Sequence, residues 1–185
     1  ASSGEAKCGV FVRNCEEQLV DAEVLPDFEG SFYTGTGRGN RKFRVDGYIL
    51  DEFDMAMNLI IADFDEDPDR ILAKPGISQC LTRLSYFAEL ALNGSLHDVI
   101  EPSTPCADLA DIIHTYKDRI RKFKYHIFTD ASVSATIKTV ETQPIGTIPT
   151  DCQVWSLERL FRICSSDLAR QSIDIDFSQF TAPGL

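Results

Sequence analysis

The 185-residue sequence lacks several features that would assign it to a class at once. It has no apolar run of the roughly 18 residues that a membrane span needs, and no basic leader followed by an apolar segment. It has only three histidines, and none of its six cysteines forms a C-x-x-C pair, so we expect no zinc site. The cysteines lie scattered among apolar neighbours, which predicts reduced, buried thiols and a cytoplasmic protein without a membrane segment.

Positive charge is also scarce. The chain has 18 Lys and Arg against 29 Asp and Glu, for a formal net charge of −11. This balance excludes non-specific nucleic-acid binding through a broad basic face, although it leaves room for a local basic groove. With 43% hydrophobic and 25% charged residues, the composition is typical of a globular protein. We expect a single domain over residues 9–185, preceded at 1–8 by a small, polar stretch that is a disordered end or a cloning remnant.

The most informative stretch runs from Lys42 to Asp65. Residues 43–50 alternate in polarity over part of their length, as a half-buried strand does. Residues 58–63 include a short β-branched run, which suits a strand buried on both faces. Between them, the turn-forming residues of 51–54 predict a β-hairpin.

Each strand of this hairpin carries an aspartate, Asp46 inside the first and Asp63 at the end of the second. Strand interiors disfavour Asp, so its presence needs a reason. Two carboxylates on neighbouring strands can converge on a divalent cation. The alternative is that Asp46 and Gly47 mark a bulge with Asp46 facing water, and that Asp63 simply ends its strand before an exposed acidic turn.

The rest of the chain predicts further helices and strands around this hairpin, with the helices packing on a sheet of at least four strands. Residues 28–40 are expected to be a glycine-rich connector. Trp155 is expected to be buried, and Leu157, Leu160, Phe161 and Cys164 to face inward from the last helix. The cations near the end of the third helix are interpreted as a solvated helix terminus rather than a phosphate contact. The expected helices are 9–23, 77–93, 107–122 and 157–164, and the expected strands are 125–130, 135–142, 153–155 and 173–177.

The order of these elements resembles the restriction-endonuclease-like fold, a mixed sheet flanked by helices of the PD-(D/E)XK type. Five stretches also resemble the amino-terminal region of the AIPR family, which are bacterial abortive-infection, phage-resistance proteins. The resemblance implies an antiphage protein, and because family members are usually several times longer, it implies a front domain whose carboxy-terminal partner domains are missing. The five stretches are 45–52, 59–64, 125–130, 154–162 and 173–177.

The resemblance also implies site residues. Asp46 matches the first acid of the nuclease pattern, and Asp63 would join it in binding Mg²⁺ with help from Glu16 or Glu17. The second strand departs from that pattern, because it has no Lys where a cation is expected to activate water and stabilise charge on phosphate. Two functions follow: a Mg²⁺-dependent nuclease acting on nucleic acid, or a degenerate domain that binds a phage component, another copy of itself or the missing domains. The absent Lys and the acidic balance favour the second.

Overall fold

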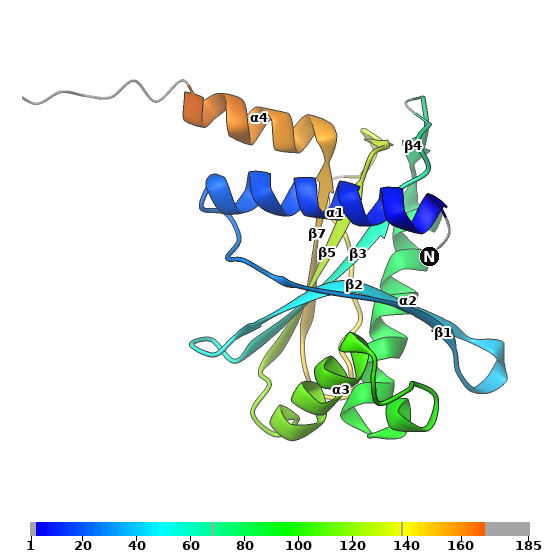
Figure 1. Cartoon of the computed structure of the whole chain (residues 1–185). Coiled ribbons are helices and arrows are strands. Elements are labelled where there is room, and N and C mark those ends of the chain that lie inside the picture. Colours follow the sequence, from blue (N-terminus) through cyan, green and yellow to red (C-terminus); the bar gives the residue numbers. More distant parts are fainter. Residues whose placement is uncertain (1–2, 68, 138, 169–185) are drawn as a thin grey trace, which may run out of the picture.

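A mixed five-stranded sheet forms the centre of the structure, with helices on both faces (Figure 1). The computed structural model describes residues 3–67, 69–137 and 139–168. Its elements in chain order are α1 (Ser3–Asp21), β1 (Glu29–Thr36), η1 (Arg38–Asn40), β2 (Lys42–Asp51), β3 (Ala56–Asp63), β4 (Ile71–Leu72), α2 (Lys74–Leu92), η2 (Ser95–Asp98), α3 (Pro105–Tyr116), β5 (Lys122–Thr129), β6 (Ser132–Val133), β7 (Thr150–Ser156) and α4 (Leu157–Leu168).

The strand order of the main sheet is β1-β2-β3-β5-β7. β1, β2 and β3 pair antiparallel, whereas β3, β5 and β7 run parallel. β4 and β6 form a separate two-stranded parallel sheet. The predicted α/β class and the mixed sheet flanked by helices are therefore confirmed.

The predicted hairpin at the centre of the sheet is confirmed. β2 and β3 are antiparallel from the pair Asp51–Ala56 to the pair Gly47–Ile60. The turn forms because the Asp51 carboxylate accepts hydrogen bonds from the backbone N–H groups of Phe53 and Asp54, both at 3.1 Å. β3 is buried along almost its whole length, which explains its continuous apolar sequence.

The two faces of the sheet bury separate apolar cores. One core lies under α2 and α3, whereas the other lies under α1 and the beginning of α4. The second core includes Trp155, which is 1% exposed, as predicted. α2 ends where Asn93 and Gly94 follow it, and Gly94 adopts a φ of 78° that favours glycine.

Several sequence-based boundaries were wrong. α1 begins at Ser3, so residues 3–8 are helical rather than a disordered end. Part of the expected connector, Glu29–Thr36, is strand β1, which pairs with β2. α3 ends at Tyr116 and β5 begins at Lys122, so of the expected helix-terminal cations only Lys117, the C-cap residue, lies at the end of the helix.

Two other differences concern the second half of the chain. Of the expected strand 135–142, the described residues are not in a strand. α4 forms where predicted, but it turns Leu160 inward and leaves Leu157 and Phe161 50% and 72% exposed. The expected strand 173–177 lies outside the described residues.

All six cysteines are free thiols. Among the helices of the described part, none is long and apolar enough to cross a membrane.

Candidate functional site

Asp46 lies in the interior of the sheet, beside a bulge in the neighbouring strand. β1 places two residues, Ser31 and Phe32, opposite Asp46, because the register shifts between the pairs Gly30–Gly47 and Tyr33–Val45. Asp46 is only 4% exposed, so the alternative in which Asp46 faces water is wrong. The bulge lies in β1 rather than at Asp46 itself.

The carboxylate of Asp46 joins β2 to β3 at the point where their backbone ladder stops. One oxygen accepts the backbone N–H of Ala62 at 2.6 Å. The other accepts two hydrogen bonds from the Arg44 guanidinium, at 3.1 Å from Nε and 3.0 Å from Nη2. Arg44 also donates to the Cys8 sulfur on α1 at 3.2 Å. The Asp46 carboxylate is therefore held by three donors from its own strand and the next.

Burial sets the electrostatics of this pair. It raises the pKa of the Asp46 carboxyl, against the opposing effects of Arg44, the Ala62 N–H and the more distant Arg83. Burial also acts against the charge of Arg44, but the ion pair with Asp46 outweighs it and raises the pKa of Arg44. Burial likewise raises the pKa of the Cys8 thiol. The Cys8 sulfur is thus a protonated thiol rather than a reactive thiolate.

A cavity of about 400 Å³ opens beside Asp46, between α1 and the β1–β2 pair. Glu16 lines it together with Asp46, so the structure brings these two predicted residues to one place. Glu16 also accepts the backbone N–H of Phe28 at 3.0 Å. Glu17 is exposed on α1 and does not line the cavity.

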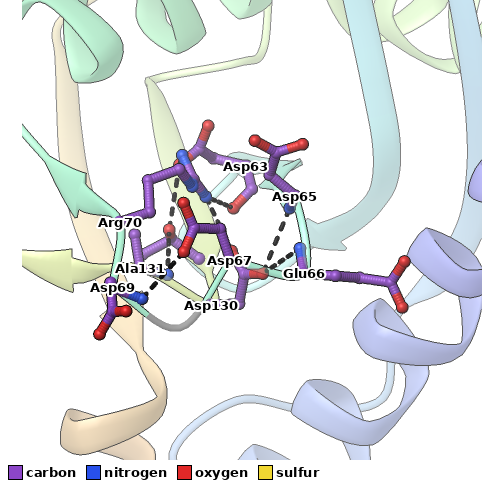
Figure 2. Close-up of polar contacts among 9 residues, drawn as sticks. Asp63, Asp65, Glu66, Asp67, Asp69, Arg70, Asp130 and Ala131 are labelled. Carbon is purple, nitrogen blue, oxygen red and sulfur yellow. Dashed lines mark hydrogen bonds and ion pairs between the residues drawn. The ribbon is translucent and has the colours of Figure 1, made fainter.

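Asp63 belongs to a second cluster, at the ends of β3 and β5 (Figure 2). Arg70 lies between two carboxylates there: Nη1 donates to Asp63 at 2.7 Å, and Nη2 donates to Asp130 at 2.7 Å. Nη2 also donates to the backbone carbonyl of Asp63 at 2.8 Å. The hydroxyl of Thr129 donates to the same Asp63 oxygen as Nη1, at 3.0 Å. One carboxylate oxygen and the backbone carbonyl of Asp63 therefore accept hydrogen bonds from Arg70, just before β4, and from Thr129 of β5.

Asp130 also orders the acidic turn after β3. It accepts backbone N–H groups from Asp65 at 3.2 Å and from Glu66 at 2.8 Å (Figure 2). Burial alone would raise the pKa of the Asp130 carboxyl, but the hydrogen bonds from Arg70 and these two N–H groups hold the pKa below its usual value. Figure 2 shows Asp65, Asp67 and Asp69 in the same group as Arg70 and Asp130, so the acidic turn lies next to this ion pair.

The arrangement does not fit a Mg²⁺ site held by Asp46 and Asp63. Each of the two carboxylates already has an arginine as its counter-charge. A divalent cation bound through carboxylates needs several free oxygen ligands. In the part of the chain that the structure describes, no three His, Cys, Asp or Glu side chains are placed to hold a metal ion.

A family model described as "Abortive infection phage resistance protein N-terminal domain" matches residues 11–162. The chain belongs to this family. The match begins within α1 and ends within α4, so it includes both clusters described above. No curated protein and no solved structure matches the chain. The family therefore places this AIPR domain in an abortive-infection, phage-resistance protein.

Two residues of the AIPR domain's second cluster, Arg70 and Asp130, were not identified from the sequence. One signal was present: Asp63 and Asp130 each follow directly on an apolar strand. Had the two strands been recognised as parallel neighbours, their carboxyl ends would have been expected to meet. Arg70 is the first cation after the acidic run 63–69, which makes it the natural counter-charge.

Replacing Arg70 with methionine should lower the free energy of unfolding of the AIPR domain by about 2 kcal/mol at pH 7. The change removes hydrogen bonds to two charged, partly buried groups, a loss of the order of 1.5–3 kcal/mol for such bonds. Urea denaturation measures the effect. Arg70→Lys should be intermediate, since Lys keeps the charge without the planar fork that reaches both carboxylates. A change below about 0.5 kcal/mol in Arg70→Met would show that the cluster does not stabilise the fold.

Proposed function

We propose that this AIPR domain is a catalytically degenerate relative of the PD-(D/E)XK nucleases that acts as a binding and assembly module in antiphage defence. The observation that carries the proposal is the pairing of both predicted metal-binding aspartates with an arginine, Asp46 with Arg44 and Asp63 with Arg70. A carboxylate that is salt-bridged and wholly or partly buried is a poor metal ligand, because binding a cation would require breaking the existing pair.

The second strand supports the same conclusion. Where the nuclease pattern has Asp or Glu, one spacer and then Lys, β3 ends with Ile61, Ala62 and Asp63. Ile61 and Ala62 are buried apolar residues. The end of β3 thus has apolar side chains and lacks the cation that would activate water or stabilise developing charge on a phosphate. As a binding module, the domain would contact the remainder of its own protein, another copy of itself, a phage component or a nucleic acid in the cytoplasm.

An active Mg²⁺-dependent nuclease acting on DNA or RNA phosphodiester bonds is the second candidate. One observation favours it: Glu16 and Asp46 line the same cavity of about 400 Å³. A cation that entered this cavity would meet carboxylates from both α1 and β2. The two candidates differ in whether a divalent metal binds the folded domain.

Millimolar Mg²⁺ or Mn²⁺ is expected to leave the melting temperature of the 185-residue chain unchanged within about 1 °C. A metal that bound only the folded state at about 100 times its Kd would add about 2.7 kcal/mol of stability. For a domain of this size, that addition corresponds to a rise of roughly 5–10 °C. Differential scanning fluorimetry with and without EDTA measures the shift.

A nuclease assay on plasmid DNA and on single-stranded RNA completes the test. No metal-dependent cleavage is expected. Cleavage that required metal and disappeared in both Asp46→Asn and Asp63→Asn would overturn the proposal in favour of the active nuclease. Asp54→Asn is the matched control, because Asp54 is exposed in the β2–β3 turn and lies outside both carboxylate clusters.

A further inference from the structure

The β1–β2 hairpin carries a run of positive charge with no acid within it, whereas the chain's other cationic run, residues 117–124, has five cations and one Asp. From residue 30 to residue 45 the sequence has four cations and no Asp or Glu, although the chain as a whole has a net charge of −11. The four are Arg38, Arg41, Lys42 and Arg44. Three of them lie at the tip of the hairpin, where β1 ends and β2 begins.

The tip is an ordered turn rather than a loose loop. β1 ends at Thr36, and the short helix η1 leads into β2 at Lys42. The backbone N–H of Gly37 donates to the carbonyl of Arg41 at 2.8 Å and closes the turn. Figure 1 shows this end of the hairpin projecting beyond the helices, at the outer edge of the sheet. The cations are therefore presented on a protruding two-stranded arm.

The cations of the tip are available to a ligand. Arg38 and Lys42 are exposed, and within the described residues neither has an ion-pair partner. Arg41 lies over the ring of Tyr86 at 3.8 Å and pairs with Glu89 at 3.5 Å, but both charged side chains are about half exposed, so water screens this pair. Arg44 is committed to Asp46 and takes no part.

The composition of the tip favours phosphate over an acidic protein as the ligand. Residues 35–42 contain only glycine, threonine, asparagine and cationic side chains. Protein–protein interfaces depend on buried aromatic or apolar anchors, and this segment has none. Arg, Lys, Thr, Asn and backbone N–H groups are the donors that contact nucleic-acid phosphates and sugars. A two-stranded β-ribbon also fits the major groove of a duplex.

We propose that the tip of the β1–β2 hairpin, through Arg38, Arg41 and Lys42, binds the phosphodiester backbone of a nucleic acid. This inference rests on the proposed function, since it names the partner of the binding module. The acidic remainder of the domain repels the same polyanion, so contact is confined to the tip and the domain's orientation is fixed. With so few cations, the contact is weak, sequence-independent and strongly dependent on salt.

Fluorescence anisotropy of the 185-residue chain with a labelled DNA duplex and a labelled single-stranded RNA, at about 50 mM salt, tests the proposal. The double variant R38E/K42E should lose at least about tenfold in affinity, because it removes two phosphate contacts and adds two repulsive charges. The matched control is K117E/R121E, which reverses the charge of two exposed cations. These cations lie at the opposite end of β2, where the backbone N–H of Arg121 donates to the carbonyl of Met55 beside the β2–β3 turn. The control should change affinity less than about twofold.

The salt dependence gives a second readout. The slope of log K against log salt should be shallower in R38E/K42E by about 0.9 per lost duplex phosphate contact, or 0.7 for a single strand. Absence of binding to both probes, equal losses in the two double variants, or equal displacement by polyglutamate would overturn the proposal; the last would identify an acidic protein as the partner. Cleavage of a bound probe would contradict the proposed function while leaving the hairpin's role intact.

Discussion

Replacing Asp46 with alanine is expected to lower the free energy of unfolding by about 3 kcal/mol at neutral pH. Removing one member of a buried ion pair leaves the other charge uncompensated, which typically costs 3–5 kcal/mol. Here Arg44 would lose both of its hydrogen bonds to the Asp46 carboxylate, and the backbone N–H of Ala62 would lose its acceptor inside the sheet. The partial exposure of Arg44, at 21% of its side chain, places the expected loss at the low end of this range.

Urea denaturation followed by circular dichroism measures this effect, with Asp54→Ala as the control. Asp54 is exposed in the β2–β3 turn, so its loss should change stability by less than about 0.5 kcal/mol. If the uncompensated arginine is the cause, Arg44→Met in the Asp46→Ala background should recover part of the stability. A double variant less stable than Asp46→Ala alone would show that Arg44 stabilises the fold independently of Asp46.

Acidification from pH 7 to pH 4 should remove about 3 kcal/mol of stability through His126 alone. His126 is 2% exposed, and burial, assisted by the charges of Lys124 and Arg159 and opposed by Asp151, lowers its pKa from 6.5 to about 4. Between these two values the unfolded chain binds a proton that the folded chain does not. Stability therefore falls as the pH drops through this window, by about 1.4 kcal/mol per unit of pKa shift.

The contacts of His126 explain why its imidazole stays neutral. Trp155 donates its indole N–H to Nδ1 at 3.1 Å, so Nδ1 is an acceptor. Nε2 then donates to the side-chain carbonyl of Asn58 at 3.0 Å. A protonated ring would place a hydrogen where the Trp155 hydrogen already lies. The neutral form is thus selected by geometry as well as by burial.

The variant His126→Gln isolates this contribution. Glutamine can accept from Trp155 and donate to Asn58, but it does not titrate. Other groups contribute to acid unfolding in both proteins, so the difference between their stability curves is the relevant quantity. We expect that difference to change by about 3 kcal/mol between pH 7 and pH 4 and to stay flat above pH 7. Parallel curves for the two proteins across this window would rule out His126 as the source.

The parts of the fold that the sequence predicted correctly have strong local signals. The β2–β3 hairpin combines two apolar runs with a turn that Asp51 closes through its own side chain. α2 has one continuous apolar stripe and a glycine at its end. β1 was missed because its sequence, EGSFYTGT, is rich in glycine and small residues and is stabilised by pairing with β2 rather than by its own pattern.

Tertiary contacts also explain two errors in the predicted helices, the end of α3 and the buried face of α4. Ile120 continues the apolar spacing of α3, yet the chain leaves the helix after Tyr116 because Arg121 donates its backbone N–H to Met55 and β5 begins. In α4, the spacing of Leu157 and Phe161 predicts an inward face, but the helix packs through Leu160 and, in part, Ile163. The local sequence pattern does not show which of these apolar faces of α4 is buried.

The candidate site was predictable only in part. The unusual position of Asp46 inside a strand identified it, and the structure shows why it is tolerated there: Arg44, two residues away on the same strand, neutralises it. Arg44 is visible in the sequence, but it was not predicted to pair with Asp46. Residues i and i+2 share one face of a strand only where the strand is regular. Arg70 and Asp130 are 60 residues apart in the chain, so the parallel pairings of β3 with β5 and of β4 with β6 are needed to bring them together.

The mixed sheet has a consequence for how the chain reaches its fold. Its antiparallel half, β1 to β3, is contiguous in sequence, whereas each residue of β3 meets its β5 partner 66 positions later, as Asp63 and Thr129 do. Closing so long a loop is slow, so the local hairpins form first. Until β5 has been synthesised, the apolar strand β3 is an open edge with unpaired backbone groups. During translation this apolar strand is therefore exposed to aggregation until β5 is available to pair with it.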